Sequence, residues 1–171
     1  SKFLVNGINN KKPIKSVKKP GMINNIAEFE IRTKFICNKI VDLAAEQRCI
    51  LVLSDRREHL KAMKDIVDKS GLECGLYLGA MKQSELKKSE EAQVLFATYG
   101  LVEEAFDLPK LNTLIFASPR TSIEQAIGRI LRKQHAVSPL IFDVADQFAN
   151  FSNQANTRRR YYKKKDYEIW D

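Results

Sequence analysis

The stretch "CILVLS" at residues 49–54 is apolar up to its closing serine. A short run of this kind, without polar alternation, predicts a strand that is buried on both faces of a sheet. Comparable runs occur at 93–98 ("QVLFAT"), 113–118 ("TLIFAS") and 139–144 ("PLIFDV"), and a further strand is predicted at 73–78. Together these strands predict one mainly parallel sheet.

The segments between the strands have helical spacing of apolar residues. We predict helices at 24–48, 56–70, 83–89, 122–132 and 147–164. Strands that alternate with helices indicate an α/β fold whose helices cover both faces of the sheet. Functional groups in such sheets gather beyond the carboxyl ends of the strands. The positions that this rule singles out are Ser54, Gly79, Thr98 and the loop after Ser118.

The composition suits one intracellular domain. The chain has 171 residues, 44% of them hydrophobic, and no apolar run approaches the roughly 20 residues of a membrane span. The first residues lack the pattern of a signal peptide. Three cysteines without a CxxC pair favour reduced thiols over a structural zinc site, so no metal ligands are expected. His59 and His135 stand alone and are expected at the surface.

The net charge of +8 is concentrated at the two ends of the chain. Residues 1–20 carry six lysines and no acid, and residues 158–171 carry six basic and three acidic residues. The part between them is close to neutral. We therefore predict a basic linker or extension at 1–21, followed by one domain at 22–171 that includes a basic tail. Basic ends favour contact with a polyanion, although they are also compatible with simple solvation.

The predicted helix at 122–132 carries an unusual polar side. In "IEQAIGRILRKQH" (123–135), Gln125, Arg129 and Arg132 fall on one side of the helix and isoleucines fall on the other. Two arginines at this spacing repel each other mildly, which suggests an anionic partner. A solvated basic surface is the alternative.

Four segments in this order resemble motifs IV, V and VI of the superfamily 2 helicases. They are "ILVLSDRREHL" (50–60), "LGAMKQSEL" (78–86), "VLFATYGLVEEAFDLPKLNTLIFASP" (94–119) and "QAIGRILR" (125–132). With the tail "RRRYYKKKDYEIW", the set is most similar to helicases of large cytoplasmic DNA viruses, of the poxvirus transcript-release type. The resemblance covers residues 22–171 and implies the second of two RecA-like domains, a three-layer sandwich with helices on both faces of the sheet.

The resemblance implies an ATP site shared with another domain. Arg132 matches the arginine finger, Arg129 matches a second phosphate-directed arginine, and Gln125 matches a residue near the γ-phosphate or the attacking water. Such guanidinium groups stabilise charge that develops on the transferred phosphoryl group. Gly128 is expected to let the helix pack closely in this site.

In motif V, Asp107 matches a carboxylate that accepts hydrogen bonds from the ATP ribose. The usual glycine before this pair is replaced by Ala105, which does not easily adopt positive φ. A capping role in an ordinary loop is therefore an alternative for Asp107.

The resemblance also implies a track for the DNA or RNA backbone. The residues assigned to it follow strands or lie in the basic tail: Ser54, Arg56, Gly79, Lys82, Thr98, Arg158, Arg159, Arg160 and Tyr161. Solvated turns are an alternative for those that follow strands, and packing of the last helix is an alternative for Tyr161.

The sequence contains no phosphate-binding loop of the form GxxxxGK[ST] and no DExD/H motif. ATP and Mg²⁺ are therefore expected to be held mainly by an N-terminal RecA-like domain of the same protein. We predict a second motor domain that is inactive and monomeric alone, acting in the host cytoplasm at the viral replication site and packaged in the virion. The rival hypothesis is a non-catalytic nucleic-acid-binding module on a degenerate helicase fold.

Overall fold

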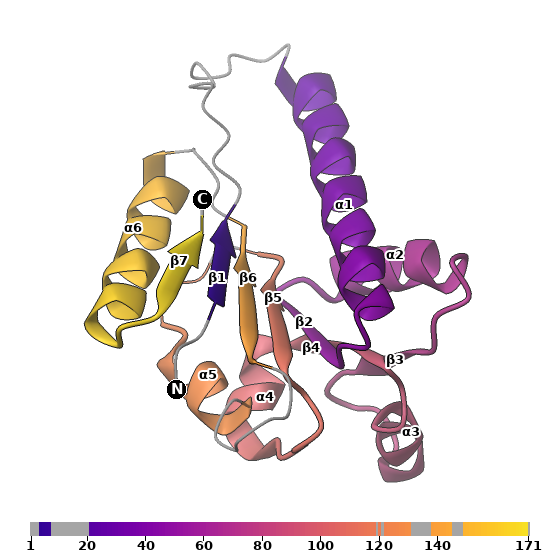
Figure 1. Cartoon of the computed structure of the whole chain (residues 1–171). Helices are drawn as coiled ribbons and strands as arrows, with labels where there is room; N and C mark the ends of the chain where they lie inside the picture. Colours follow the sequence, from indigo (N-terminus) through magenta and orange to yellow (C-terminus); the bar gives the residue numbers. More distant parts are fainter. Residues whose placement is uncertain are drawn as a thin grey trace.

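The computed structural model describes residues 4–7, 21–118, 120, 122–130, 138–144 and 149–170, shown in Figure 1. The side chains it describes belong to residues 29–104, 106–118, 120, 122–128, 138–144 and 153–169. These residues form one sheet with helices on both of its faces, as the sequence predicted.

The strands follow the order β3-β4-β2-β5-β6-β1-β7 across the sheet, and all six of the neighbouring pairs are parallel. Their bounds are β1 (Leu4–Gly7), β2 (Ile50–Ser54), β3 (Cys74–Tyr77), β4 (Val94–Thr98), β5 (Thr113–Phe116), β6 (Leu140–Asp143) and β7 (Glu168–Trp170). The helices are α1 (Gly21–Ala45), α2 (Arg57–Asp68), α3 (Gln83–Ser89), α4 (Tyr99–Ala105), α5 (Glu124–Ile130) and α6 (Ala149–Lys164).

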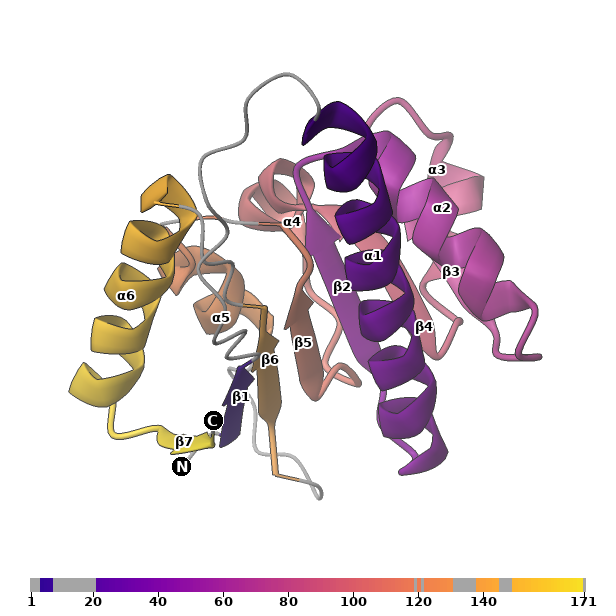
Figure 2. The same ribbon diagram turned by 90° about the horizontal axis from the view of Figure 1, so that it is seen from above.

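Alternate residues of the central strands supply two separate cores. Ile50 and Val52 face α1 and α2, which bury residues such as Ile36 and Leu60. Leu51 and Leu53 face the opposite way, toward α4, α5 and α6. Figure 2 shows α1 and α2 on one side of the sheet and α5 and α6 on the other. Burial on both faces explains why the strands are apolar throughout.

The helices pack through stripes of apolar residues spaced by three or four positions. In α1 the apolar stripe is Ile36, Cys37, Ile40, Leu43 and Ala44, and the polar Thr33 is buried on the same side. This helix ends where Gln47 adopts the left-handed conformation, with φ 63°. At the edge of the sheet, a Cβ atom on Gly75 would lie 2.9 Å from three atoms of Ser89, so glycine allows the end of α3 to approach β3.

Three elements differ from the sequence prediction. Residues Leu4–Gly7 form β1 inside the predicted linker and pair with β6 and β7. The segment after Thr98, where no helix was predicted, forms the helix α4, and the chain adds β7 after the last helix. The predicted helix at 122–132 extends into residues outside those described, and its described part is α5.

Candidate nucleotide and nucleic-acid interface

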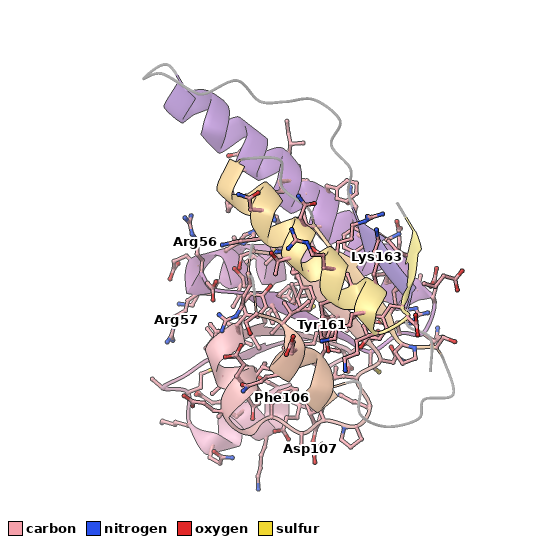
Figure 3. The ribbon with its side chains drawn as sticks, turned by 90° about the vertical axis from the view of Figure 1, so that its left-hand side faces the viewer. Arg56, Arg57, Phe106, Asp107, Tyr161 and Lys163 are labelled. Atoms are coloured by element: carbon pink, nitrogen blue, oxygen red, sulfur yellow. The ribbon has the colours of Figure 1, made fainter. Side chains whose placement is uncertain are left out.

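The turn after β2 is held from within by Ser54. In the register of the sheet, Ser54 lies beside Thr98 at the carboxyl edge. The Ser54 hydroxyl oxygen accepts a hydrogen bond from the Arg56 backbone N–H at 3.1 Å, and its side chain is fully buried. The predicted place of Ser54 in the nucleic-acid track stays a prediction, and its buried hydroxyl does not favour a contact through the side chain. Its buried hydroxyl instead shapes the turn that leaves Arg56 exposed (Figure 3).

His59 is buried, which corrects its predicted position at the surface. It lies between Thr33 Oγ1, 3.2 Å from its Nε2, and Ser54 Oγ, 3.5 Å from its Nδ1. Its ring also contacts Phe29, with 4.8 Å between ring centroids. Burial, followed by the charges of Arg32 and Arg56, lowers the pKa of His59 to about 4. The ring is thus neutral at physiological pH and fastens α1 to the β2 turn.

The turn after β3 has its strained residue at Ala80, where φ is 67°, and not at Gly79. Alanine rarely adopts this conformation because its Cβ crowds the backbone. The turn leads into α3, where the Lys82 backbone N–H donates to Glu85 Oε2 at 3.0 Å. Gly79 is half-exposed and the Lys82 side chain is exposed, so both are accessible to a ligand.

The part of motif V that follows Thr98 begins with the helix α4. Thr98 is half-buried and immediately precedes this helix, and Asp107 is exposed two residues after its end. Phe106, between them, is buried edge-on against Tyr77 at 4.9 Å between ring centroids. Helical backbone runs through Ala105, so the turn is made without the positive φ that a glycine would allow. Asp107 therefore points outward from a fixed neighbour (Figure 3).

The helix α5 separates buried and exposed sides as its sequence predicted. Ile123, Ala126 and Ile127 are buried against the sheet, whereas Gln125 and Gly128 are exposed. No described atom lies within 4 Å of a Cβ built on Gly128, so the close packing predicted for this glycine is not made within the described part of the chain. The Arg129 side chain and all of Arg132 lie outside the described residues.

The three arginines that begin the basic tail have different environments. Arg158 is 1% exposed, and its guanidinium donates from Nε and Nη2 to both Asp143 oxygens at 2.8 Å. The nucleic-acid contact predicted for Arg158 stays a prediction, and the pairing of its charge in the interior disfavours it. Burial alone would lower the pKa of Arg158, but hydrogen bonds from Arg158 to Asp143 raise it above its usual value. Arg159 is half-buried and Arg160 is exposed.

Tyr161 packs within α6 and against Tyr167, which precedes β7, as the packing alternative predicted. Its ring centroid lies 6.2 Å from those of Tyr162 and Tyr167, both roughly edge-on. Lys165 places its Nζ 5.9 Å from the same ring. These contacts leave Tyr161 half-buried, so a nucleic-acid base could reach only part of its ring.

Sequence reasoning pointed to the loop after Ser118 but missed the residue that organises it, Arg120. Its Nη1 donates to Asp55 Oδ1 at 3.0 Å, and its Nη2 donates to Glu103 Oε1 at 2.7 Å. The guanidinium also lies over the Tyr99 ring, 4.8 Å from the centroid. A basic residue among small polar ones in "ASPRTS" was the only signal in the sequence.

Within the described ranges, no three His, Cys, Asp or Glu side chains come together as metal ligands. None of the helices in that same part of the chain is long and apolar enough to cross a membrane.

Residues 32–134 match the family described as the helicase conserved C-terminal domain. The chain belongs to this family of helicase C-terminal domains.

Viral proteins are among its relatives. A protein of Acanthamoeba polyphaga mimivirus named as an ATP-dependent RNA helicase is 33% identical over 153 residues, which is 86% of this chain and 30% of that protein. An African swine fever virus protein with the same kind of name is 29% identical over 66% of this chain and 22% of that protein. The chain thus spans less than a third of these relatives. The resemblance to viral superfamily 2 helicases is confirmed.

Solved structures share the fold. The T4 UvsW structure matches 99% of this chain and 40% of that chain, with a TM-score of 0.73 and 18% identity. The C-terminal domain of the DEAD-box protein Dbp5 matches 98% of this chain and 88% of that chain, with a TM-score of 0.62 and 12% identity. At such low identity these matches confirm the RecA-like architecture alone.

Proposed function

We propose that this chain is the second motor domain of an ATP-dependent nucleic-acid helicase or translocase. Its arginine finger is Arg132, its second phosphate-directed arginine is Arg129, and Gln125 orients the γ-phosphate or the attacking water. The observation that carries the proposal is the family match over 32–134, which includes all three residues. The exposure of Gln125, opposite a buried side of α5, supports it.

The remainder of the ATP site belongs, in this proposal, to an N-terminal RecA-like domain of the same protein. That domain holds the phosphates and Mg²⁺, which neutralises phosphate charge when bound. From this chain, Asp107 accepts hydrogen bonds from the ribose, and its exposure fits that role. Because the chain lacks the phosphate-binding loop, we expect it to bind ATP weakly and to hydrolyse none alone.

The nucleic-acid track, in this proposal, follows the carboxyl edge of β2, β3 and β4. Exposed Arg56 and Lys82 are its main cations, and Gly79 and Thr98 offer backbone or hydroxyl groups to phosphates. Arg159 and Arg160 extend it from α6. The substrate is the backbone of DNA or RNA, and the place of action is the host cytoplasm of a viral infection.

The experiment measures steady-state ATPase and nucleic-acid binding on a protein that joins this chain to its N-terminal domain. Arg132→Lys keeps the charge but removes the planar fork, so we expect kcat to fall at least ~10²-fold with binding unchanged. Arg56→Ala should weaken nucleic-acid binding and spare basal ATPase. If Arg132→Lys kept most of its kcat, the finger assignment would be wrong and Arg129 would be the better candidate.

The same experiment separates the second candidate, a nucleic-acid-binding module without catalysis. That candidate predicts nucleic-acid binding that no Arg132 variant alters and no ATPase in the joined protein. The basic surface of α6 favours binding to a polyanion under either candidate function, so it does not distinguish between them.

A further inference from the structure

We propose that Arg120 is a positioning residue that couples the nucleic-acid track to α5, the helix that carries Gln125 and Arg129. This inference rests on the proposed function, because it assigns a signal between the two sites named there. Arg120 belongs to neither site. It contacts Asp55, which is next to Arg56 of the track, and Ser122, which is close to the start of α5.

The contacts of the Arg120 guanidinium join the turn after β2 to the helix α4 of motif V. Asp55, which precedes Arg56, accepts from Arg120 Nη1, and Glu103 of α4 accepts from Arg120 Nη2. The Arg120 and Glu103 side chains are 26% and 23% exposed, so this pair is shielded from solvent more than the 51% exposed Asp55. One planar guanidinium thus serves two carboxylates from separate elements through two nitrogens in a fixed fork, whereas a lysine would have to serve both from a single nitrogen.

The same residue reaches the start of α5. Arg120 Nε donates to the Ser122 carbonyl oxygen at 3.2 Å, two residues before α5 begins. The Arg120 carbonyl oxygen is itself held by Arg158 Nη1 at 2.7 Å. The backbone of Arg120 is therefore anchored to α6, and only its guanidinium can shift its position between Asp55 and Glu103.

Two further bonds hold the loop after β5, one to the β2 turn and one to α4. The Asp55 backbone N–H donates to Ser118 Oγ at 2.9 Å, and Tyr99 Oη donates to the Ser118 carbonyl oxygen at 3.0 Å. A phosphate bound at Arg56 adds an anion beside Asp55, which draws the Arg120 guanidinium toward the turn. Since Ser122 accepts from that guanidinium, the shift changes the first turn of α5.

The test is hydrogen exchange of the α5 amides in this chain, with and without single-stranded oligo(dT) or oligo(rU). The chain has cores on both faces of its sheet, so it is suitable alone. In the unaltered chain we expect oligonucleotide to slow α5 exchange about fivefold or more. In Arg120→Ala this slowing should vanish, with oligonucleotide affinity within about twofold of the unaltered chain. Arg120→Lys should give an intermediate slowing.

Controls separate coupling from simple stabilisation. Lys64→Ala removes a cation that pairs with Asp68 at 2.7 Å in the last turn of α2, and it should leave the slowing intact. Glu103→Gln removes one carboxylate with little change of shape, and it decides the question if Arg120→Ala does not fold. A purely structural Arg120 would speed α5 exchange equally with and without oligonucleotide, which leaves their ratio unchanged.

The outcomes are distinct. Equal slowing in Arg120→Ala, or oligonucleotide binding with no α5 response in the unaltered chain, overturns the coupling and leaves the proposed function standing. Absence of any oligonucleotide binding by the unaltered chain contradicts the proposed track and the coupling together.

Discussion

Arg158 and Asp143 form a buried, two-pronged ion pair that joins the middle of α6 to the end of β6. Tyr162, one turn further along α6, donates to the same Asp143 at 2.8 Å. Burial, and then the charge of Asp143, raises the pKa of Tyr162 well above its usual value, so its hydroxyl stays protonated and donates. Arg158 and Tyr162 of the basic tail therefore hold α6 against the end of β6.

We expect Arg158→Ala to lower the free energy of unfolding by about 3–5 kcal/mol, because it leaves the Asp143 carboxylate buried without its cation. Urea denaturation measures the change. Arg160→Ala, two residues away and exposed, should alter stability by less than about 0.5 kcal/mol. A loss below about 1 kcal/mol for Arg158→Ala would contradict this account of the pair.

The exposed cations of α6 should carry the non-specific affinity of the tail. Replacing Arg160, Lys163 and Lys164 by alanine should lower the slope of log affinity against log salt by up to about two for single strands. Replacing Lys61, Lys64 and Lys69 of the α2 region makes the same change of charge and should leave the slope unchanged. Equal slopes in both triple variants would assign the effect to net charge alone. Truncation at 158 is unsuitable as a test, because it also removes buried Arg158 and Tyr162.

Stability should fall in mild acid because of His59. Its pKa is about 4 in the folded chain and about 6.5 unfolded, so the unfolded state takes up the proton first as pH falls. The contribution of a neutral His59 is complete above pH 6.5 and is lost as the pH falls from 6.5 toward 4. We expect about 2 kcal/mol less stability at pH 5 than at pH 7 from this group.

Denaturation at both pH values, on the unaltered chain and on His59→Gln, separates the contribution of His59 to stability from that of the carboxylates. Glutamine cannot titrate, so the variant should lose about 2 kcal/mol less between pH 7 and pH 5. The same loss in both proteins would mean that folding does not lower the pKa of His59.

The turn after β3 should be more stable with glycine than with alanine at position 80. At Ala80 the positive φ costs an L-residue roughly 1 kcal/mol, which glycine avoids at a cost in chain entropy. Ala80→Gly should therefore stabilise the chain by up to about 1 kcal/mol. Gly71, with φ 85° and open space around its Cβ position, is the matched control. Gly71→Ala should destabilise by a similar amount, and thermal unfolding of both variants checks the signs.

The sheet and its central helices could be predicted because burial on both faces imposes a signal that is local in sequence. The run 49–54 shows this signal whichever strands it pairs with. The helix α3 begins and ends where its pattern predicted, at 83–89. The helix α4 was missed because it has only seven residues, with a glycine at the second, which is too short for a periodic pattern, although Tyr99 and Val102 are buried three apart. The strand β1 was missed because its pairing partners lie more than 130 residues away.

Site residues were harder to predict where charge was the signal. Arg158, Arg159 and Arg160 are indistinguishable as sequence, and only the tertiary position of Asp143 decides which one is buried. Asp55 and Glu103 are likewise ordinary acids until the fold brings both to Arg120. Ser54 was placed correctly at the end of a strand, but the direction of its side chain depended on His59 and the Arg56 amide.

Because α3 contacts the edge strand β3 at Gly75, a displacement at that contact would tilt the whole helix. Ser89, the last residue of α3, packs against the backbone of Gly75. Lys82 immediately precedes the first residue of α3 and lies about 10 Å from Ser89. A methyl group at 75 would push the Ser89 end outward and swing Lys82 in turn. Position 75 touches no proposed ligand, yet its variants would emerge in a screen for weakened nucleic-acid binding alongside those of Lys82 itself.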